Sequence, residues 1–583
     1  MSVFNKIPDP KELEKELNEY LAKKYGSKIK LAMPLVIPQK DEGVIEKESK
    51  SQRKSRKIRF DLKPEELEAY LNEFIVKQDD AKEVLATKIC THFNRIKYWE
   101  EHKGKEKYDR VGMIKSNIIM IGPTGVGKTY LIKLIAKRIG VPFVKGDATK
   151  FSETGYVGGD VEDLVRDLLQ ETNGDIELAQ CGIIYIDEID KIASGNNVVG
   201  IDVSRTGVQR GLLKPMEETE VDLKVPHDIV SQMEAMEHFR KTGKKEKRTV
   251  NTKNILFIVS GAFNALTEII EKRVNRQSIG FGADLKQNDD ETDYLKMVTS
   301  KDLMQYGFES EFIGRLPVLT VFSKLDVSDL YQILKNRNSE VINGKKWDFK
   351  AYGIDLRFED KALYKLAERA FEQNTGARGL VSVVEKALMK FEKKLPSTTI
   401  KRLLVTKEIV DNPEREIELL LKGGEGKDEK ARYNKVIREE KTELKKYIKK
   451  QKSNFPERFI PFLKGTRLHL IVERVVKTGI ELGVVLEEIL SMDETVRKYE
   501  KTFFKESGIK ISFEERAVDQ LLEMALEEET PIDELCNVIF KNYQQGLKLV
   551  KEKTGKNGFM ITKEAIRNPE GFLNKLIKES YEN

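Results

Sequence analysis

Cysteine is scarce in this sequence of 583 residues, which contains three, Cys90, Cys181 and Cys536, all far apart. Neither a CxxC pair nor a nearby histidine cluster accompanies them. This spacing disfavours both a disulfide framework and a zinc site. We therefore expect three buried thiols.

Long apolar runs are also missing. The longest, around 183–186 and 255–259, have the length of strands and end in polar residues, so no membrane span is predicted. The start, MSVFNKIPDPKELEKE, lacks the apolar core of a secretory signal, and we expect a cytoplasmic protein. No aromatic residue interleaves with the basic run at 51–59, which favours a solvated linker over a nucleic-acid arm.

The chain is too long for a single hydrophobic core, and its pattern changes along its length. Residues 1–60 hold a short predicted helix and a basic linker. From 61 to 323, helix-period segments alternate with β-branched runs, which is typical of a parallel sheet covered by helices. Residues 324–421 are mostly helical, 422–445 form a charged linker, and 446–583 form a last helical block.

The last block contains an internal repeat. The segment beginning at Tyr352 aligns without a gap with the one beginning at Ser507, and VTKEIVDNPE from Val405 pairs with ITKEAIRNPE from Ile561. Upstream, FESEFIGRL pairs more weakly with FPERFIPFL. We interpret the block as a degenerate copy of the preceding module's second half, the alternative being a shared amphipathic helix pattern.

The stretch GPTGVGKT, between an apolar strand and a helix-period run, has the spacing of a phosphate-binding P-loop. Its glycines let backbone N–H groups turn toward phosphates, Lys128 supplies a point charge, and the Thr129 hydroxyl can ligate Mg²⁺. The expected ATP contacts are Gly122, Pro123, Thr124, Gly125, Val126, Gly127, Lys128, Thr129 and Tyr130.

Two adjacent carboxylates, Asp187 and Glu188, end the apolar run of GIIYIDEIDKIA. Carboxylates at the carboxyl end of a buried parallel strand face the ligand crevice of an open α/β sheet. Asp187 is then the residue on the Mg²⁺ side, and Glu188 the base that activates water. The alternative is that both carboxylates simply begin a helix.

These motifs and others resemble the ClpX and HslU ATPases, in family order over residues 61–415. The matching segments are GPTGVGKT, DATKFSETGYVGGDVEDLVRDLL, IDEIDKIA, GVQRGLLKPMEE, NILFIVSGAF, EFIGRLPV and TGARGL. The resemblance implies an α/β fold: an AAA+ P-loop NTPase large domain with a parallel sheet, a helical small domain and, here, a mostly helical C-terminal extension.

The resemblance also implies roles for further residues. Arg315, in EFIGRLP, matches the arginine finger that enters a neighbouring subunit's nucleotide site, and Arg378, in TGARGL, matches the nucleotide sensor. FIVKQ matches the segment that contacts adenine, through Ile75 and Val76. Lys77 replaces the family's glycine there.

GYVG at 155–158 matches the loop that grips substrate in the family's central pore, with Tyr156 and Val157 as the gripping residues. An aromatic residue between glycines forms a movable apolar surface suited to polypeptide. A nucleic-acid motor needs basic residues at that place. A buried tyrosine in a glycine-rich turn is the alternative interpretation.

SIGFGAD resembles the loop with which ClpX docks on the ClpP peptidase, with Ile279, Gly280 and Phe281 as the docking tripeptide. Apolar anchors of this kind are typical hot spots. A local hydrophobic contact is the alternative explanation.

The sequence departs from the family in three further places. Residues 1–60 contain no cysteine, so we expect no zinc module like that of ClpX. The stretch 224–250 is longer and more basic than the family's pore-entrance loop. In the C-terminal copy, Asp533 replaces Arg378 and Phe462 replaces Arg315, so we expect no ATP binding there.

Together these features favour an ATP- and Mg²⁺-dependent protein unfoldase that forms a homo-hexamer and feeds protein substrates to a ClpP-like peptidase. We expect neither membrane nor nucleic acid as a partner. Two alternatives stay open. One is a remodelling chaperone without a protease, and the other is a nucleotide-gated scaffold whose basic runs, at 51–59 and 241–248, contact nucleic acid.

Overall fold

The computed structural model describes residues 60–102, 115–151, 159–193, 203–222, 249–277, 291–423, 427–452, 455–541 and 543–582. The chain divides into two compact units, Met1–Lys57 and Ile58–Asn583, and the first lies outside these ranges together with the helix expected in residues 1–60. None of the helices in the described ranges has the length and apolar character that a membrane crossing requires.

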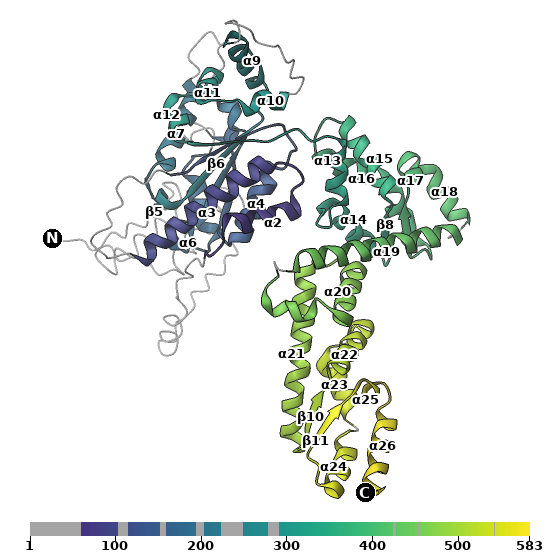
Figure 1. Cartoon of the computed structure of the whole chain (residues 1–583). Helices are drawn as coiled ribbons and strands as arrows, with labels where there is room; N and C mark the ends of the chain where they lie inside the picture. Colours follow the sequence, from purple (N-terminus) through teal and green to yellow (C-terminus); the bar gives the residue numbers. More distant parts are fainter. Residues whose placement is uncertain are drawn as a thin grey trace, which may run out of the picture. The chain divides into compact units, whose positions relative to one another are not determined.

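A five-stranded parallel sheet forms the centre of the large domain (Figure 1). Its strands lie in the order β2-β3-β6-β1-β7, and all four neighbouring pairs are parallel. The strands are β1 (Ile118–Ile121), β2 (Phe143–Asp147), β3 (Ile183–Asp187), β6 (Leu256–Gly261) and β7 (Val318–Val321). The continuous apolar runs of β1, β3 and β6 are buried because helices cover both faces. The expected parallel sheet is therefore confirmed.

Alternate residues of each inner strand join two different cores, as the two-residue period of a strand requires. Ile118 and Met120 pack with α2 (Pro64–Phe74), α3 (Asp79–Glu101) and α4 (Lys128–Ile139). Ile119 and Ile121 belong to the core on the other face. The helices of that face are α5 (Asp163–Glu171), α7 (Val203–Met216), α9 (Leu266–Gln277), α10 (Glu291–Lys296), α11 (Ser300–Tyr306) and α12 (Ser310–Gly314).

Short elements connect these layers. They are η1 (Ala148–Lys150), α6 (Ile176–Ala179), η2 (Ile189–Ile192), η3 (Thr252–Asn254) and the antiparallel pair β4 (Glu220–Asp222) and β5 (Thr249–Asn251).

Cys90, Cys181 and Cys536 are all buried free thiols, as the sequence predicts, and burial raises their pKa values to about 11, 12 and 12.

The helical lobe that follows the sheet runs from α13 to α18. Its elements are α13 (Val327–Lys335), α14 (Glu340–Ala351), β8 (Asp355–Phe358), α15 (Asp360–Glu372), α16 (Arg378–Lys394), η4 (Leu395–Ser397), β9 (Arg402–Val405), α17 (Lys407–Asp411) and α18 (Pro413–Gly423). β8 and β9 form a parallel pair, with Asp355 opposite Arg402. Helices therefore dominate the second domain, in agreement with the predicted fold class.

Most of the stretch 422–445 that we expected to be a charged linker is helical, because α19 spans Lys427–Lys450. This helix docks on the lobe through polar contacts: Arg432 donates to both carboxylate oxygens of Glu359, at 2.8 and 2.7 Å, and the Tyr433 hydroxyl donates to Asp355. Partners distant in sequence thus stabilise a helix whose composition resembles that of a linker.

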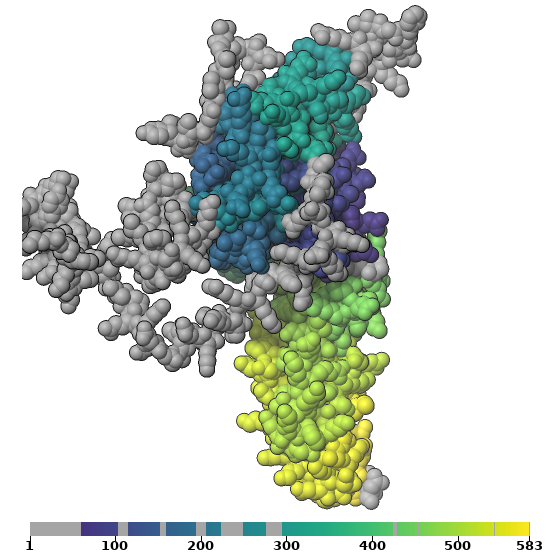
Figure 2. Space-filling view, turned by 90° about the vertical axis from the view of Figure 1, so that its left-hand side faces the viewer, coloured from purple at the N-terminus to yellow at the C-terminus, as the bar shows by residue number. Residues whose placement is uncertain are grey.

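The remaining C-terminal residues have a hydrophobic core of their own. Figure 2 shows their surface, coloured light green to yellow. The elements are η6 (Glu457–Phe462), α20 (Gly465–Thr478), α21 (Leu482–Ser507), β10 (Lys510–Phe513), α22 (Glu515–Glu528), α23 (Ile532–Phe540), α24 (Tyr543–Thr554), β11 (Gly558–Ile561), α25 (Lys563–Arg567) and α26 (Pro569–Glu582).

The element order of this block repeats that of the helical lobe. β10 and β11 form a parallel pair whose residues are those that the sequence repeat aligns with β8 and β9. A threonine side chain, Thr406 or Thr562, then caps the short helix after each second strand. One helix differs, because α23 and α24 occupy the place of the single helix α16.

Candidate functional site

The P-loop lies between the end of β1 and the start of α4, as the sequence predicts. Gly125 and Gly127 have φ angles of 78° and 94°, which lie in the left-handed region that glycine favours. A Cβ on Gly125 would lie only 2.2 Å from the Thr375 carbonyl oxygen. The Ala377 N–H donates to the Gly125 carbonyl at 2.8 Å. Glycine at this turn therefore lets the TGAR segment approach the loop closely.

Lys128 begins α4 and is buried beneath the loop. Its ammonium donates to the carbonyl oxygens of Gly122, at 2.6 Å, and Pro123, at 2.8 Å. Burial lowers the pKa of Lys128 to about 8, because the charged form loses contact with water. A buried ammonium at the amino end of a helix is suited to phosphate oxygens.

Asp187 ends β3 at the centre of a hydrogen-bonded network. Its Oδ1 accepts from the Ser260 hydroxyl at 2.8 Å and from the Glu188 N–H at 3.1 Å. Its Oδ2 lies 2.9 Å from the Lys145 ammonium and 3.4 Å from the Thr129 hydroxyl. Burial alone would raise the pKa of Asp187, but the bonds from Lys145 and Ser260 outweigh it and lower that pKa.

The oxygen atoms of Thr129 and Asp187 fit a magnesium ion. Mg²⁺ prefers oxygen ligands at about 2.1 Å in an octahedron, so two adjacent ligands lie about 3 Å apart. The separation of 3.4 Å between Thr129 Oγ1 and Asp187 Oδ2 is close to that value. A hydroxyl and a carboxylate are also the donors that hold this ion in P-loop enzymes.

Glu188 follows Asp187 in a left-handed conformation, with φ of 57° and ψ of 34°. A residue with a Cβ in this region carries strain of roughly 1–3 kcal/mol, which the surrounding structure must hold. Its neighbours Ile189 and Asp190 are buried, and Asp190 accepts from the Ala262 N–H at 3.2 Å. Strain of this kind is concentrated at functional positions, and the Glu188 side chain is exposed.

The two candidate arginines lie at opposite ends of the parallel strands. Arg378 begins α16 directly after Ala377, which contacts the P-loop. The Arg315 carbonyl accepts from Asn117, the residue just before β1. Arg315 is therefore at the amino-terminal edge, where its guanidinium pairs with Glu217 at 2.5 Å and stays 52% exposed.

The expected adenine segment follows α2. Ile75 is buried and Val76 is half-buried. Lys77 has a φ of 60°, so it occupies the left-handed region where the family has glycine. Its ammonium pairs with Asp329 at 2.6 Å, a contact that glycine could not make.

The next residue, Gln78, also has a left-handed φ, of 63°, and is buried. Its side-chain amide exchanges two hydrogen bonds with the backbone of Ser323, where the sheet ends and the helical lobe begins. The Gln78 Nε2 donates at 2.7 Å and its Oε1 accepts at 2.8 Å. The adenine segment is thus bonded directly to the connection between the two domains.

The remaining predicted positions are elsewhere or outside the described ranges. Tyr130 turns toward Glu340 of α14 and lines a cavity that does not include the other P-loop residues. The pore residues Tyr156 and Val157 and the docking tripeptide Ile279, Gly280 and Phe281 lie outside the described residues.

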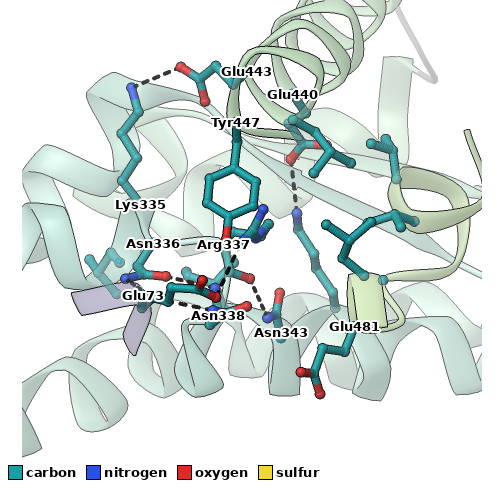
Figure 3. A pocket seen from close by; sticks show the side chains of 18 of the residues that line it. Glu73, Lys335, Asn336, Arg337, Asn338, Asn343, Glu440, Glu443, Tyr447 and Glu481 are labelled. Carbon is teal, nitrogen blue, oxygen red and sulfur yellow. Dashed lines mark hydrogen bonds and ion pairs between the residues drawn. The ribbon is translucent and has the colours of Figure 1, made fainter. Parts of the chain in front are cut away.

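That cavity, of about 1900 Å³, lies among α2, α4, α14, α19 and α20 (Figure 3). Charged side chains line it: the Arg337 guanidinium lies 3.6 Å from the centre of the Tyr447 ring, and the Lys335 ammonium lies 3.7 Å from a carboxylate oxygen of Glu443. Neither Lys128 nor Asp187 lines this hollow. The candidate phosphate- and metal-binding groups, Lys128, Thr129 and Asp187, converge instead on the P-loop side of the sheet.

Sequence reasoning missed three residues of the Asp187 network, namely Lys145, Tyr185 and Ser260. The Tyr185 hydroxyl is 2.6 Å from Ser260 Oγ and 3.0 Å from Thr129 Oγ1. A signal existed for two of them, because Tyr185 and Ser260 are hydroxyl side chains near the carboxyl ends of apolar strands. Lys145 gave no such signal, since it is a lysine on the edge strand β2.

A P-loop on β1, an acidic pair on β3 and a helical lobe that contacts the P-loop define the class: the chain is an AAA+ ATPase. Residues 114–319 match the family described as AAA domain (Cdc48 subfamily). Residues 325–401 match the family described as the C-terminal, D2-small domain of ClpB protein.

Similarity to individual proteins identifies the family within this class. The ATP-dependent Clp protease ATP-binding subunit ClpX of Borrelia duttonii (strain Ly) is 41% identical over 352 residues, which are 60% of this chain and 78% of that protein. The protein of the same name from Treponema denticola is 39% identical over 354 residues, 60% of this chain and 81% of its own. The chain belongs to the ClpX family. It binds nucleotide and is an ATP hydrolase, an ATP-dependent unfoldase of the Clp type.

Proposed function

We propose that the chain forms a homo-hexameric ring in which each ATP is hydrolysed between two protomers. The position of Arg315 supports this proposal most strongly. Arg315 lies beside the amino end of β1, whereas the P-loop follows its carboxyl end. The four residues of β1 between them span about 13 Å. Because Arg315 cannot serve its own P-loop across that distance, its exposed guanidinium is placed to serve a neighbour's.

Within one protomer, the residues divide the work of hydrolysis. Thr129 and Asp187 would hold Mg²⁺, which neutralises charge on the β- and γ-phosphates when bound. Glu188 would orient the attacking water and accept its proton. Lys128 and Arg378 would contact the phosphates from two sides of the loop, and Ile75 and Val76 would contact the adenine.

A complementation experiment tests the shared site. The Lys128→Ala and Arg315→Ala variants should each hydrolyse ATP at no more than a few per cent of the wild-type rate. When the two are mixed before assembly, some interfaces combine an intact P-loop with an intact Arg315, and activity should return. Failure of the mixture to regain activity, in rings shown by native mass spectrometry to contain both variants, would contradict the proposal.

Glu188→Gln tests the catalytic base separately. It removes the proton acceptor but keeps the shape, so nucleotide should still bind while turnover falls about a hundredfold or more. Fluorescent-nucleotide titration and phosphate release measure the two effects. Turnover at the wild-type rate would contradict the assignment of Glu188.

We further propose that Tyr156 and Val157 move polypeptide through the ring and that Ile279, Gly280 and Phe281 dock a ClpP-like peptidase. Tyr156→Ala should keep the ATPase activity and slow the unfolding of a tagged fluorescent protein. Phe281→Ala should keep both activities and lose the peptidase on co-purification. If wild-type protein captures no peptidase ring yet still unfolds substrate, the chain is a remodelling chaperone that works without a protease.

A further inference from the structure

Lys145 lies beside the proposed metal site, and nothing in the proposed function uses it. It is on β2, and the parallel register places it opposite Tyr185, two residues before Asp187 on β3. Its ammonium is 2.9 Å from Asp187 Oδ2 and 5.9 Å from the centre of the Tyr185 ring. The Lys145 side chain is 40% exposed, so its charged end can exchange this partner for another without crossing the protein interior.

The network around Asp187 assigns its two oxygens to different tasks. Oδ1 is held by two donors, the Ser260 hydroxyl and the Glu188 N–H. Oδ2 is the oxygen that faces Thr129, and Lys145 makes its close contact with this same oxygen. A divalent cation that binds between Thr129 and Asp187 therefore needs the atom with which the ammonium pairs.

A purely structural role for the pair makes a different prediction. If the ion pair has only a structural role, removing the lysine should leave metal affinity unchanged. If the lysine and the metal ion instead compete for one carboxylate oxygen, their positive charges repel each other. Removing the lysine should then raise metal affinity.

We propose that Lys145 is a positioning residue that competes with Mg²⁺ for Asp187 Oδ2 and releases this oxygen when nucleotide phosphates offer the ammonium another partner. The inference rests on the proposed metal-side role of Thr129 and Asp187. Metal binding is then weak in the absence of nucleotide and strong in its presence, because the nucleotide's phosphates supply the negative charge that draws the Lys145 ammonium away from Asp187. The linkage is reciprocal, as binding couplings must be.

Mn²⁺ titration followed by electron paramagnetic resonance tests this on the full-length protein without nucleotide. Lys145→Met keeps most of the aliphatic stem and removes the charge, and it should tighten Mn²⁺ binding at least about fivefold. Lys133→Met, at an exposed lysine of α4, is the matched control and should leave the affinity as in wild type. With saturating ADP, the difference between Lys145→Met and wild type should shrink to less than about twofold.

The Asp187→Asn variant separates the two levels of the argument. If Asp187→Asn weakens Mn²⁺ binding but Lys145→Met matches wild type, the lysine inference is wrong and the metal-side assignment stands. If Asp187→Asn itself leaves Mn²⁺ binding unchanged, the metal-side assignment is wrong and the inference falls with it. In an Asp187→Asn background, Lys145→Met should no longer tighten binding, because the shared oxygen has lost its charge.

Discussion

The helical lobe and its C-terminal copy have the same strand pairing but different surroundings. In the lobe, the TGAR segment contacts the P-loop through Ala377, and Arg378 follows directly. In the copy, Asp533 stands at the aligned position, and Phe462, which aligns with Arg315, is buried with the Arg467 guanidinium 4.9 Å from its ring centre. The copy thus shares the strand pairing of the lobe but has different residues at the two positions that we propose to meet nucleotide. Fold and chemistry therefore depend on separable sets of positions.

The cores of the two copies fill equivalent space differently. Where the alignment continues, Leu388 of the lobe corresponds to Tyr543, and Ile409 to Ala565; all four residues are buried. The Tyr543 hydroxyl donates to the Ala565 carbonyl at 2.6 Å. A larger side chain in one helix is thus accompanied by a smaller one in the helix beside it, which preserves total volume.

The largest effect is expected from Tyr543→Ala, which should destabilise the C-terminal copy by roughly 4 kcal/mol. Both tryptophans, Trp99 and Trp347, lie outside the copy. Denaturation followed by circular dichroism should therefore show a new early transition without an early change in tryptophan fluorescence. Tyr543→Phe loses only the hydrogen bond and should cost about 1 kcal/mol. Simultaneous loss of both signals would mean that the two copies unfold as one unit.

Arg357→Ser introduces the residue that the copy has at the aligned position, Ser512. Arg357 is buried and pairs with Asp355 and Glu440, so its removal takes the cation from between these two carboxylates and leaves them only Tyr433 and Lys346 as partners. The expected loss is about 3 kcal/mol. It should appear as a lower denaturation midpoint and as faster proteolysis within α19, which Glu440 anchors. Ser512→Ala is the control and should change neither measurement.

Exchanging the aligned pair Arg378 and Asp533 tests the loss of chemistry. Arg378→Asp removes a cation beside the P-loop and adds an anion, so the ATPase rate should fall about a hundredfold. Asp533→Arg should change this rate less than about twofold, since the copy has no P-loop to serve. Comparable losses from both substitutions would show that the copy takes part in hydrolysis.

The smallest effects are expected at the two threonine caps. Thr406→Ala and Thr562→Ala should each lower the free energy of unfolding by about 1 kcal/mol or less, because each hydroxyl accepts one long bond, of 3.5 and 3.4 Å. Thr→Ser at either position keeps the hydroxyl and should restore most of the loss. A clearly larger effect at one cap would reveal a difference between the copies that their backbones do not show.

The sequence predicts the features that depend on local pattern. Apolar runs place the parallel strands, the glycine spacing places Lys128 and Thr129, and the end of an apolar run places Asp187. It does not predict contacts between residues that only the folded sheet brings together. Lys145 meets Asp187 because β2 pairs with β3, and no periodicity in either segment encodes that meeting. The helix α19 was missed for a similar reason, since its partners Glu359 and Asp355 are on another part of the chain.

The two hydrogen bonds between Gln78 and Ser323 have a mechanical consequence. They hold Gln78, the residue after Lys77, against the corner where the sheet ends and the lobe begins. Lys77 and Gln78 both have strained, left-handed backbone conformations. A rotation of the lobe about this corner must twist the segment proposed to contact the base. If the base binds there as proposed, we expect its binding to be coupled through these two hydrogen bonds to the orientation of the lobe.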